Sequence, residues 1–316
     1  MGEGSPKSIP ELGRYRDLVK IGEGSMGAVY RARDPVLDRA VAIKLLTAQG
    51  PGFVSRIQRE ARALAKVSHP NVVQIHDSGI DPNGAPYFVM EHLHGRSLDA
   101  LLEERGRLPH QQVRELVRQA AQGLSAAHAA GLIHRDIKPA NLFLETNGNL
   151  KILDFGIARS VEQNAAESGD VRVLGTPYYM APELLNAEPV DLRADVYALG
   201  LTAFHLLTGR PPFISDTPFG VASMQLTEPL PDPRTLAAGL PEDLCWLIER
   251  MAEKDRSTRI QSCDEVARLL GLPPPELSAL SQSTSQAALP VRSPWILAIA
   301  ALLLGALALA GALLAR

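Results

Sequence analysis

This chain of 316 residues contains few cysteines and few aromatic residues, and neither sign of charge is in large excess. Only two cysteines occur, Cys245 and Cys263, and so low a number excludes a disulfide scaffold. Because their spacing fits no metal site, we expect reduced structural thiols. The 32 basic and 35 acidic residues nearly cancel, which excludes a broad positive field that would attract nucleic acid. None of the eight histidines stands in H-E-x-x-H spacing, so the sequence gives no case for a zinc enzyme.

Hydrophobic residues, by contrast, are plentiful and unevenly spread. They make up 46% of the chain, which is typical of a folded protein and excludes global disorder. Residues 295–315 form an uncharged run, and a helix of that length spans about 31 Å, close to the hydrocarbon core of a bilayer. Arg292 precedes the run and Trp295 opens it, as suits the headgroup region. A buried core helix is the alternative, but only Arg316 follows the run, so we predict one membrane-spanning helix.

The composition divides the remainder of the chain into three parts. Residues 1–14 form an N-terminal tail without the apolar stretch of a signal peptide. Residues 273–294 are rich in Pro and Ser and poor in large apolar side chains, which is typical of a linker. Residues 15–272 lie between them and carry the hydrophobic pattern of a folded domain, without a repeat that would indicate a solenoid.

The first half of this domain has the pattern of a sheet with one helix. Phe53, Ile57, Ala61 and Leu64 recur at helical spacing after a Gly-Pro-Gly breaker and predict the helix. Short runs rich in Val, Ile and Tyr predict strands. These runs are residues 15–21, 28–32, 40–46, 72–75 and 87–91.

After Ser97 the period of the apolar residues becomes helical. An amphipathic helix is predicted over 113–127, and residues 195–208 are so apolar all round that we expect a buried helix. The predicted fold class is therefore α+β, with a small β-rich lobe over 15–91 and a larger helical lobe over 94–272.

Glycines are concentrated in the small lobe at residues 21–29, which read I-G-E-G-S-M-G-A-V. Because glycine has no Cβ, a hairpin of this composition lets backbone amides approach phosphate groups closely. The same G-x-G-x-x-G spacing also opens dinucleotide-binding folds, but those place a helix directly after it. Here a second strand is predicted instead, and it leads to V-A-I-K at 41–44. Lys44 is then either a surface residue that reaches water or, as we favour, a partner for anions.

Three further motifs follow in order along the chain. They are H-R-D-I-K-P-A-N at 134–141, D-F-G at 154–156 and A-P-E at 181–183. Together with the glycine-rich hairpin and V-A-I-K, they resemble the motifs of the eukaryotic-type (Hanks-type) serine/threonine protein kinases, in the membrane-anchored form found in bacteria. The resemblance covers residues 15–272 and implies the bilobal protein kinase fold, here with one C-terminal transmembrane helix.

The resemblance implies ATP as the phosphate donor and Mg²⁺ as its metal, with Mn²⁺ as an alternative. Lys44 is expected to contact the α and β phosphates and, in the active state, to pair with Glu60 on the helix of the small lobe. Asn141 and Asp154 are the expected metal ligands. Met90 takes the gatekeeper position behind the adenine. The expected ATP-binding residues are Ile21, Gly22, Glu23, Gly24, Ser25, Met26, Gly27, Val29, Ala42, Lys44, Glu91, Leu93 and Phe143.

By the same resemblance Asp136 and Lys138 are the catalytic residues. Asp136 is expected to accept or orient the proton of the substrate hydroxyl, and Lys138 to neutralise charge on the γ phosphate. Phosphoryl transfer depends on positioning and charge neutralisation more than on covalent help, so one base, two cations and two metal ligands suffice. Lys138, together with G-T-P at 175–177, resembles the serine/threonine class and not the tyrosine class. Thr176 is expected to hydrogen-bond Asp136 and Lys138 beside the protein substrate.

Other motif residues are expected to hold the structure. Glu183 should pair with Arg259, and Asp195 should tether the backbone of the catalytic loop. The family's regulatory hydrophobic stack would be formed by Leu64, Ile75, His134 and Phe155. The expected structural residues are His134, Arg135, Phe155, Glu183, Asp195 and Arg259.

The segment 156–175 departs from the family's pattern. Arg135 usually needs a phosphorylated partner there, and the bacterial relatives typically carry threonines, but this segment offers only two serines. We expect that Ser168 is phosphorylated in trans, or that Glu167 or Asp170 partly substitutes for a phosphate.

The expected function is transfer of the γ-phosphoryl group of Mg-ATP to Ser and Thr hydroxyls of proteins, with autophosphorylation, in membrane-associated signalling. Two alternatives stay open. A nucleotide-binding scaffold would normally have lost one of the charged motif residues, and a small-molecule phosphotransferase usually lacks the G-T-P and A-P-E segments.

The expected partners are protein substrates and the membrane, and no nucleic acid; a homodimer for phosphorylation in trans is left open. The kinase domain must meet ATP, so we expect it in the cytoplasm at the cell (inner or plasma) membrane. With one residue after the predicted span, we expect no folded sensor domain beyond it.

Overall fold

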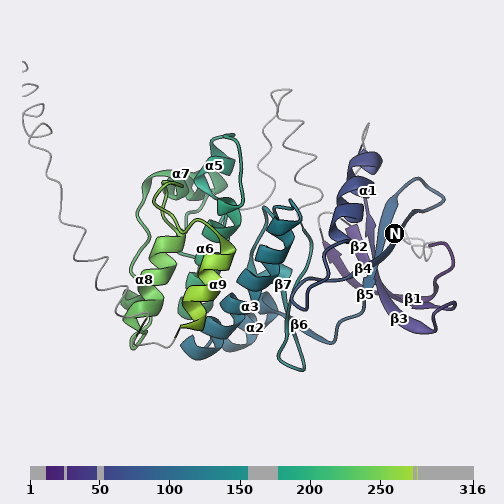
Figure 1. Ribbon diagram of the computed structural model, residues 1–316, viewed down its shortest axis with the longest axis horizontal. Helices are drawn as coiled ribbons and strands as arrows, with labels where there is room; N and C mark the ends of the chain where they lie inside the picture. The colour runs from purple at the N-terminus through teal and green to yellow at the C-terminus, as the bar shows by residue number, and fades with distance from the viewer. Residues whose placement is uncertain (1–11, 25–26, 48–52, 156–176, 273–275, 277–316) are drawn as a thin grey trace, which may run out of the picture. The chain divides into compact units, whose positions relative to one another are not determined.

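A five-stranded antiparallel sheet forms the first part of the chain in the computed structural model, which describes residues 12–24, 27–47, 53–155, 177–272 and 276. The strands follow the order β1-β2-β3-β5-β4 (Figure 1). Helix α1 (Phe53–Leu64) comes between β3 and β4 in the chain and contacts β4 and β5. The strands are β1 (Arg16–Gly24), β2 (Gly27–Asp34), β3 (Arg39–Leu46), β4 (Ile75–Ile80) and β5 (Pro86–Glu91).

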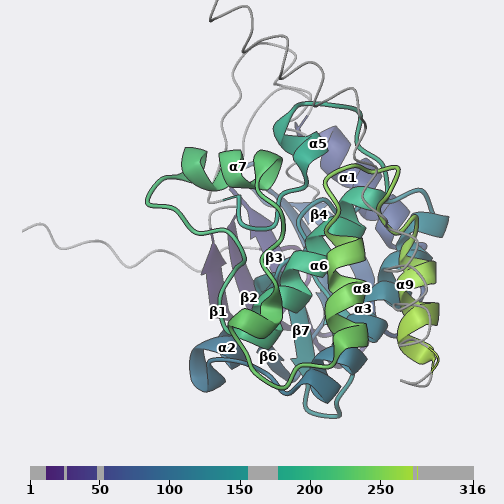
Figure 2. The ribbon, with the colours of Figure 1, turned by 90° about the vertical axis from the view of Figure 1, so that its left-hand side faces the viewer.

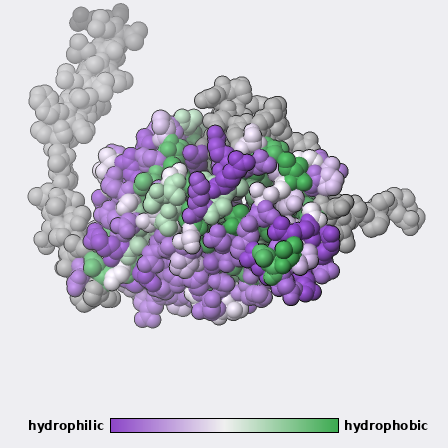
Figure 3. Space-filling model, turned by 45° about the vertical axis from the view of Figure 1, so that its right-hand side comes forward, coloured by the Kyte–Doolittle hydropathy of each residue, from purple (hydrophilic) through white to green (hydrophobic). Residues whose placement is uncertain are grey.

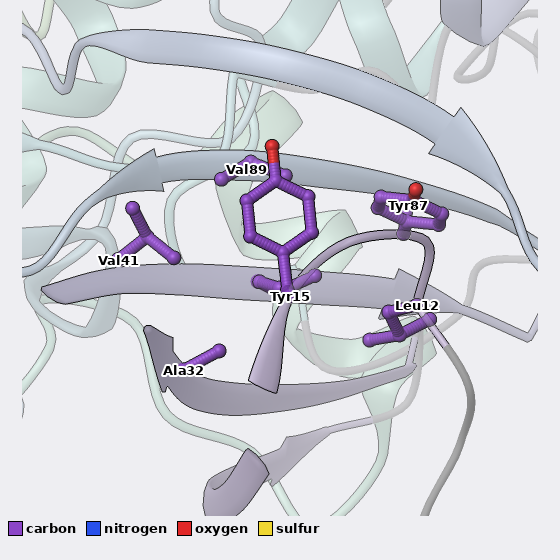
Figure 4. Packing of buried hydrophobic residues seen from close by; sticks show 7 residues of the cluster. Leu12, Tyr15, Ala32, Val41, Tyr87 and Val89 are labelled. Carbon is purple, nitrogen blue, oxygen red and sulfur yellow. The ribbon is translucent and has the colours of Figure 1, made fainter. Parts of the chain in front are cut away.

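The alternation of side chains along β3 decides what each face of the sheet buries. Ile43 belongs to a cluster on one face, whereas Leu46 belongs to a cluster that attaches α1 to the other. Lys44 shares the face of Leu46, because side chains two residues apart in a strand point the same way. The first cluster holds Leu12, Tyr15, Ala32, Val41, Ile43, Tyr87 and Val89 (Figure 4). The second holds Leu46, Ile57, Ala61 and Phe88.

The second part of the chain is mainly helical. Helix α6 is buried along almost its whole length because it is apolar nearly all round, and α3, α8 and α9 pack against it (Figure 2). The helices are α2 (Leu98–Arg105), α3 (His110–Ala129), α5 (Pro182–Leu185), α6 (Arg193–Thr208), α7 (Pro218–Thr227), α8 (Glu242–Met251) and α9 (Cys263–Gly271). A small antiparallel sheet is formed by β6 (Gly95–Ser97), β7 (Leu142–Glu145) and β8 (Leu150–Ile152). Single 3₁₀ turns lie at η1 (Pro139–Asn141) and η2 (Pro233–Thr235).

The predicted strand at 72–75 is wrong in its position. Strand β4 begins only at Ile75, and its polar residues weaken the hydrophobic signal that marks a strand. Val72 and Val73 are buried where the large sheet meets the helical part, and the amide of Val73 donates to the Ile152 carbonyl at 3.0 Å. Their apolar character therefore reflects burial against β8, with one isolated bridge from Val72 to Ile152, and not pairing within the large sheet.

The other predicted elements agree with the structure to within a few residues. The periodic residues of the first predicted helix span α1, the helix predicted over 113–127 lies within α3, and the buried helix predicted over 195–208 is α6. The sheet-rich first part and helical second part confirm the predicted lobes. Cys245 and Cys263 are buried and not joined by a disulfide, and burial raises the pKa of the Cys245 thiol to about 11. Burial also raises the pKa of the Cys263 thiol, as is typical of structural cysteines.

The surface shows no single dominant apolar region on the face in Figure 3, where hydrophobic residues lie in small patches between hydrophilic ones. Among the described residues, the most exposed large apolar side chains are Phe219 in α7 and Val36 in the turn between β2 and β3. Exposed apolar side chains in such small groups are normal on protein surfaces, so they do not locate a functional site.

The predicted membrane span at 295–315 lies outside the described residues, as do the tail residues 1–11 and most of the predicted linker. Within the described part, no helix has both the length and the apolar composition needed to cross a bilayer.

Candidate active site

A cavity of about 550 Å³ lies between the large sheet and the loop that follows α3. This volume is in the usual range for small-molecule sites. One group of lining residues is apolar: Val29, Leu46, Leu64, Val73, Ile75, Phe88, Met90 and Phe155. The other group is charged or polar: Lys44, Asp136, Lys138, Asn141 and Asp154, with Glu23 and Ser97. The structure therefore brings the predicted catalytic, phosphate-binding and metal-binding residues to one space.

The predicted catalytic loop, residues 134–141, is held by the carboxylate of Asp195, which is fully buried at the start of α6. Its two oxygens accept the backbone amides of His134 at 2.8 Å and Arg135 at 2.7 Å. His128 of α3 contacts the same carboxylate through Nε2 at 2.8 Å. Arg135 has a φ of +63°, a conformation that non-glycine residues adopt only when their surroundings hold them there. The tether predicted for Asp195 is thus the contact that the structure shows.

Asp136 lines the cavity with its carboxylate held by two neighbours in the same loop. Lys138 donates from Nζ to Asp136 Oδ2 at 2.8 Å. Asn141 donates from Nδ2 to the same oxygen at 3.0 Å and to the backbone carbonyl of Asp136 at 2.7 Å. Asn141 ends the turn η1, five residues after Asp136, and there its side chain meets those of Asp136 and Lys138. A carboxylate oriented in this way can accept a proton from a hydroxyl at the cavity wall.

His134 acts inside this loop as a packing and hydrogen-bonding residue. Its Nε2 lies 2.7 Å from the carbonyl oxygen of Leu153, and its Nδ1 accepts the amide of Asp136 at 3.2 Å. Both contacts are met by a neutral ring protonated at Nε2, and burial lowers the pKa of His134, which favours that neutral form. Its ring centroid lies 4.7 Å from that of Phe155, so the structure joins these two members of the predicted stack.

Lys44 of β3 reaches across the cavity to the segment after β8. Its Nζ lies 2.6 Å from Oδ1 of Asp154, and the Lys44 side chain is largely buried. Asp154 has a φ of +50°, a second strained position at the cavity wall. The structure thus connects the predicted phosphate-binding lysine with the predicted metal ligand. Glu60 is half-buried in α1, and its pairing with Lys44 stays a prediction.

The glycine-rich hairpin between β1 and β2 covers one side of the cavity, which Gly22, Glu23, Gly24 and Gly27 line. Gly27 has a φ of +146°, and a Cβ on it would lie only 1.9 Å from the carbonyl oxygen of Leu45. A glycine is therefore required there for β2 to pair with β3. The hairpin residues Ser25 and Met26 lie outside the described part of the chain.

The residues predicted around adenine are only partly at the cavity. Val29 lines it, as does Met90 at the gatekeeper position. Ala42 is buried and pairs with Met90 across β3 and β5. The remaining adenine contacts stay predictions, because these residues do not line the described cavity: Ile21, Ala42, Glu91, Leu93 and Phe143.

Sequence reasoning missed the role of the Glu91 side chain. Its Oε1 accepts Lys151 Nζ at 2.7 Å and the amide of Gln74 at 2.8 Å. These bonds tie the end of β5 to β8 and to the segment before β4, just before the chain continues into the helical part. The resemblance implies only ATP binding for Glu91, and no motif marks Lys151 as its partner.

Glu183 and Arg259 form the buried ion pair that the resemblance implied. Nη1 of Arg259 lies 2.7 Å from Oε1 of Glu183, and both side chains are essentially unexposed. The guanidinium also donates to the carbonyls of Arg193, Glu253 and Lys254, so its charge and its donors are satisfied. The predicted substrate-side residues Thr176 and Ser168 lie outside the described residues.

Asn141 and Asp154 fit a Mg²⁺ site by their chemistry. Magnesium prefers oxygen ligands, and Nδ2 of Asn141 is used by two bonds to Asp136, which leaves its amide oxygen for a cation. In the described part of the chain, no three His, Cys, Asp or Glu side chains gather into a metal site. A magnesium ion here would therefore complete its shell with phosphate oxygens and water, as it commonly does beside nucleotides.

Comparison with known proteins agrees with this geometry. The family model described as the protein kinase domain matches residues 15–268. Serine/threonine-protein kinase PknB of Mycobacterium leprae is 38% identical over 253 residues, which cover 78% of this chain and 40% of that protein. Serine/threonine-protein kinase PknB of Mycolicibacterium smegmatis is 39% identical over 267 residues, 80% of this chain and 42% of that protein. The chain thus spans about two fifths of the length of these relatives. It belongs to the protein kinase family, in the branch of the bacterial serine/threonine kinases.

Proposed function

We propose that this chain transfers the γ-phosphoryl group of ATP to serine and threonine hydroxyls of proteins. The observation that carries the proposal is the convergence of two charged pairs on one cavity, Lys138 with Asp136 and Lys44 with Asp154. The first pair supplies a base with its adjacent cation, and the second supplies a phosphate-binding cation with a metal ligand. The apolar residues of the same cavity suit a flat nucleotide base.

The residues divide the work of the reaction. The hydroxyl oxygen of the acceptor bonds to the γ phosphorus, and Asp136 accepts the proton of that hydroxyl. At the same time the bond between this phosphorus and the bridging oxygen of ADP breaks. Lys138 lies beside Asp136 and balances charge on the group in transit. Lys44 holds the phosphates of the nucleotide against the sheet. A magnesium ion held by Asn141 and Asp154 supplies further neutralisation of phosphate charge when it is bound.

The proposed acceptor is a protein hydroxyl and not a small molecule. The printed names of the relatives are those of serine/threonine-protein kinases. The sequence also contains G-T-P and A-P-E segments, and the second of these is buried through the Glu183 pair with Arg259.

The test is transfer of labelled γ phosphate by the full chain in detergent, with Mg²⁺, to a generic basic protein and to a panel of sugars and aminoglycosides. We expect label on phosphoserine and phosphothreonine of the protein and of the chain itself. Asp136→Asn is the control and should abolish this label while nucleotide binding persists. Label on a small molecule in preference to protein would contradict the proposed acceptor class, and nucleotide binding without any transfer would favour a scaffold.

We propose in addition that residues 295–315 anchor the chain in the cell membrane with the kinase domain in the cytoplasm. The support is the length and the uncharged composition of that run. In sealed, right-side-out vesicles, an added protease should spare the kinase domain. Digestion of that domain under these conditions would contradict the proposed orientation, and recovery of the intact chain in the aqueous fraction would contradict the anchor.

Regulation by phosphorylation of Ser168 is also proposed. Arg135 lies next to Asp136 and usually needs a phosphorylated partner, and residues 156–175 offer only two hydroxyl side chains. Phosphopeptide mapping after incubation with ATP should find phosphate on Ser168, and Ser168→Ala should slow transfer. An unmodified Ser168 in a fully active enzyme would contradict this mode of activation.

A further inference from the structure

A buried glutamine holds the main chain directly after the predicted substrate-side residue Thr176. Gln225 lies in α7 and has no solvent exposure. Its Nε2 donates to the carbonyl oxygen of Tyr178 at 2.7 Å and to that of Pro177 at 3.2 Å. The amide thereby uses both of its protons on two consecutive carbonyls of one segment, 47 and 48 residues away in the chain.

The other end of the glutamine amide is fixed as well. Tyr197 of α6, also fully buried, donates its hydroxyl to Oε1 of Gln225 at 2.6 Å. The oxygen of Tyr197 in turn accepts Nζ of Lys254 at 2.8 Å. With a donor on its oxygen and two acceptors on its nitrogen, the amide cannot turn over without losing bonds on both sides.

Lys254 is the last member of this chain of hydrogen bonds, and it lies where burial removes water from its charged group. Its Nζ lies 4.2 Å from the ring centroid of Phe213 and 5.4 Å from that of Tyr197, so two aromatic faces partly replace water. Burial lowers the pKa of Lys254 to about 8, with Arg259 lowering it further and Glu228 opposing that shift. The two charged groups that act on this pKa are thus Arg259, which is paired with Glu183, and Glu228.

These polar groups lie in an otherwise apolar cluster, which packing alone does not explain. The cluster contains the residues Ala181, Ala194, Tyr197, Leu201, Phe213, Val221 and Ala252. Apolar side chains of similar size would fill the same space without the cost of desolvating a lysine and an amide. A fully bonded polar chain instead specifies one arrangement of the groups at its end. Here that end is the backbone of Pro177 and Tyr178.

We propose that Gln225, held by Tyr197 and Lys254, is a positioning residue for the protein acceptor. It fixes the backbone that follows Thr176, the residue expected to bond Asp136, and so sets where the acceptor segment lies relative to the base. None of these three residues lines the cavity, so the effect falls on the acceptor and not on the nucleotide. The inference rests on the proposed kinase function.

The test compares Gln225→Met, which keeps the volume but makes no hydrogen bonds, with Tyr197→Phe, which removes only one oxygen. Thr202→Val is the matched control, because Thr202 is also fully buried in α6 and its hydroxyl has no hydrogen-bond partner among the described residues. Full-length proteins are assayed for kcat and KM with a basic protein acceptor, for the KM of ATP, and for hydrolysis of ATP in the absence of acceptor.

We expect Gln225→Met and Tyr197→Phe to lower kcat/KM for the protein acceptor by about tenfold, the factor for loss of one or two buried hydrogen bonds. The KM of ATP and the hydrolysis of ATP to water should change less than about twofold, and Thr202→Val should resemble the wild type. An equal loss of protein phosphorylation and ATP hydrolysis, or no loss of either, would overturn the proposal.

Amide hydrogen exchange of the peptide containing residues 177–181 provides a readout that does not depend on activity. Exchange should be faster in Gln225→Met and Tyr197→Phe than in the wild type and in Thr202→Val. Unchanged exchange would overturn the positioning role even if activity fell. A wild-type chain that binds nucleotide but phosphorylates nothing would contradict the proposed kinase function, while the exchange experiment would still decide whether Gln225 holds this segment.

Discussion

The two sides of the cavity are built differently. On the helical side, Asp136 lies in a loop whose backbone is bonded to a fully buried carboxylate, and its side chain has two bonded neighbours. On the sheet side, strand β1 is exposed along most of its length, with Ile21 53% exposed, and Lys44 reaches the opposite wall through its ion pair with Asp154. Folding alone thus orients the base, whereas the glycine-rich hairpin that covers the cavity begins in a strand that is exposed to water.

This difference suits the order of events that phosphoryl transfer requires. A base that is already oriented needs no rearrangement at the moment of reaction, which is the main source of electrostatic catalysis. A nucleotide must enter and leave, so the glycine-rich hairpin that covers it has to be free to move. Four substitutions test the contrast through their effects on the stability of the folded chain.

Removal of the Asp195 carboxylate on the helical side of the cavity should have the greatest effect on stability. Asp195→Ala leaves the buried amides of His134 and Arg135 without their acceptor, and we expect a loss of about 3 to 5 kcal/mol of stability. Denaturant titration measures this loss, and Asp195→Asn should lose less because one acceptor oxygen remains. If Asp195→Ala unfolds at the same denaturant concentration as the wild type, the loop is not held by this carboxylate.

A smaller effect is expected from the hairpin of the sheet side. Gly27→Ala places a Cβ against the carbonyl of Leu45 at a φ of +146°, and strain of about 1 to 3 kcal/mol should result. Gly24→Ala is the matched control, since its Cβ would meet nothing within 4 Å. Thermal melts of the two variants should therefore separate clearly. Equal melting temperatures would show that the hairpin relaxes around the new side chain.

The buried ring of His134 should make stability depend on pH. Burial lowers the pKa of His134 in the folded state below its ordinary value near 6.5, so the unfolded chain binds more protons as the pH falls. Stability should therefore fall as the pH drops below about 6.5, by up to about 1.4 kcal/mol per pH unit for this one group.

Denaturant midpoints between pH 7.5 and pH 5.5 measure this dependence. His134→Phe should be less stable at pH 7.5, because the Leu153 carbonyl loses its partner, but should show a shallower decline. Four other histidines also have a lowered pKa through burial, so some decline remains in the variant; they are His69, His76, His92 and His205. Identical slopes would contradict the role given to His134.

The sheet-side lysine should matter least for stability and strongly for catalysis. Lys44→Met removes one ion pair with the 40%-exposed Asp154, so unfolding should change by less than about 1 kcal/mol. Transfer of phosphate should nevertheless fall about 100-fold or more, because a charge aimed at the phosphates is gone. Glu104→Gln, in the exposed pair with Arg96, is a control that should change neither quantity. A large loss of stability in Lys44→Met would remove the contrast between the two sides.

The sequence predicts the site where its parts are close in the chain or set in recognisable patterns. The resemblance of one motif implies the roles of Asp136, Lys138 and Asn141, and the structure joins these three side chains by hydrogen bonds. The helices α1 and α6 are predicted by their apolar spacing because burial dictates which positions are apolar.

Contacts between distant polar residues have no comparable signal. Lys151 with Glu91, and Gln225 with Tyr178, join side chains and backbone 47 to 60 residues apart at positions that no periodicity distinguishes. The prediction of a strand at 72–75 is wrong for a related reason. Residues buried between the large sheet and the helical part form the same kind of apolar run as a strand does. Tertiary packing decides such cases.

Single-turnover transfer by the full chain and its Asp136→Asn variant, measured beside the affinity of each for Mg-ATP, is the most direct examination of the proposed chemistry. If Asp136 is the base that folding has already oriented, the variant binds nucleotide as tightly as the wild type and transfers phosphate about 10² to 10⁴ times more slowly. Transfer at the wild-type rate by Asp136→Asn, or a loss of rate that only follows a loss of nucleotide affinity, would contradict that role.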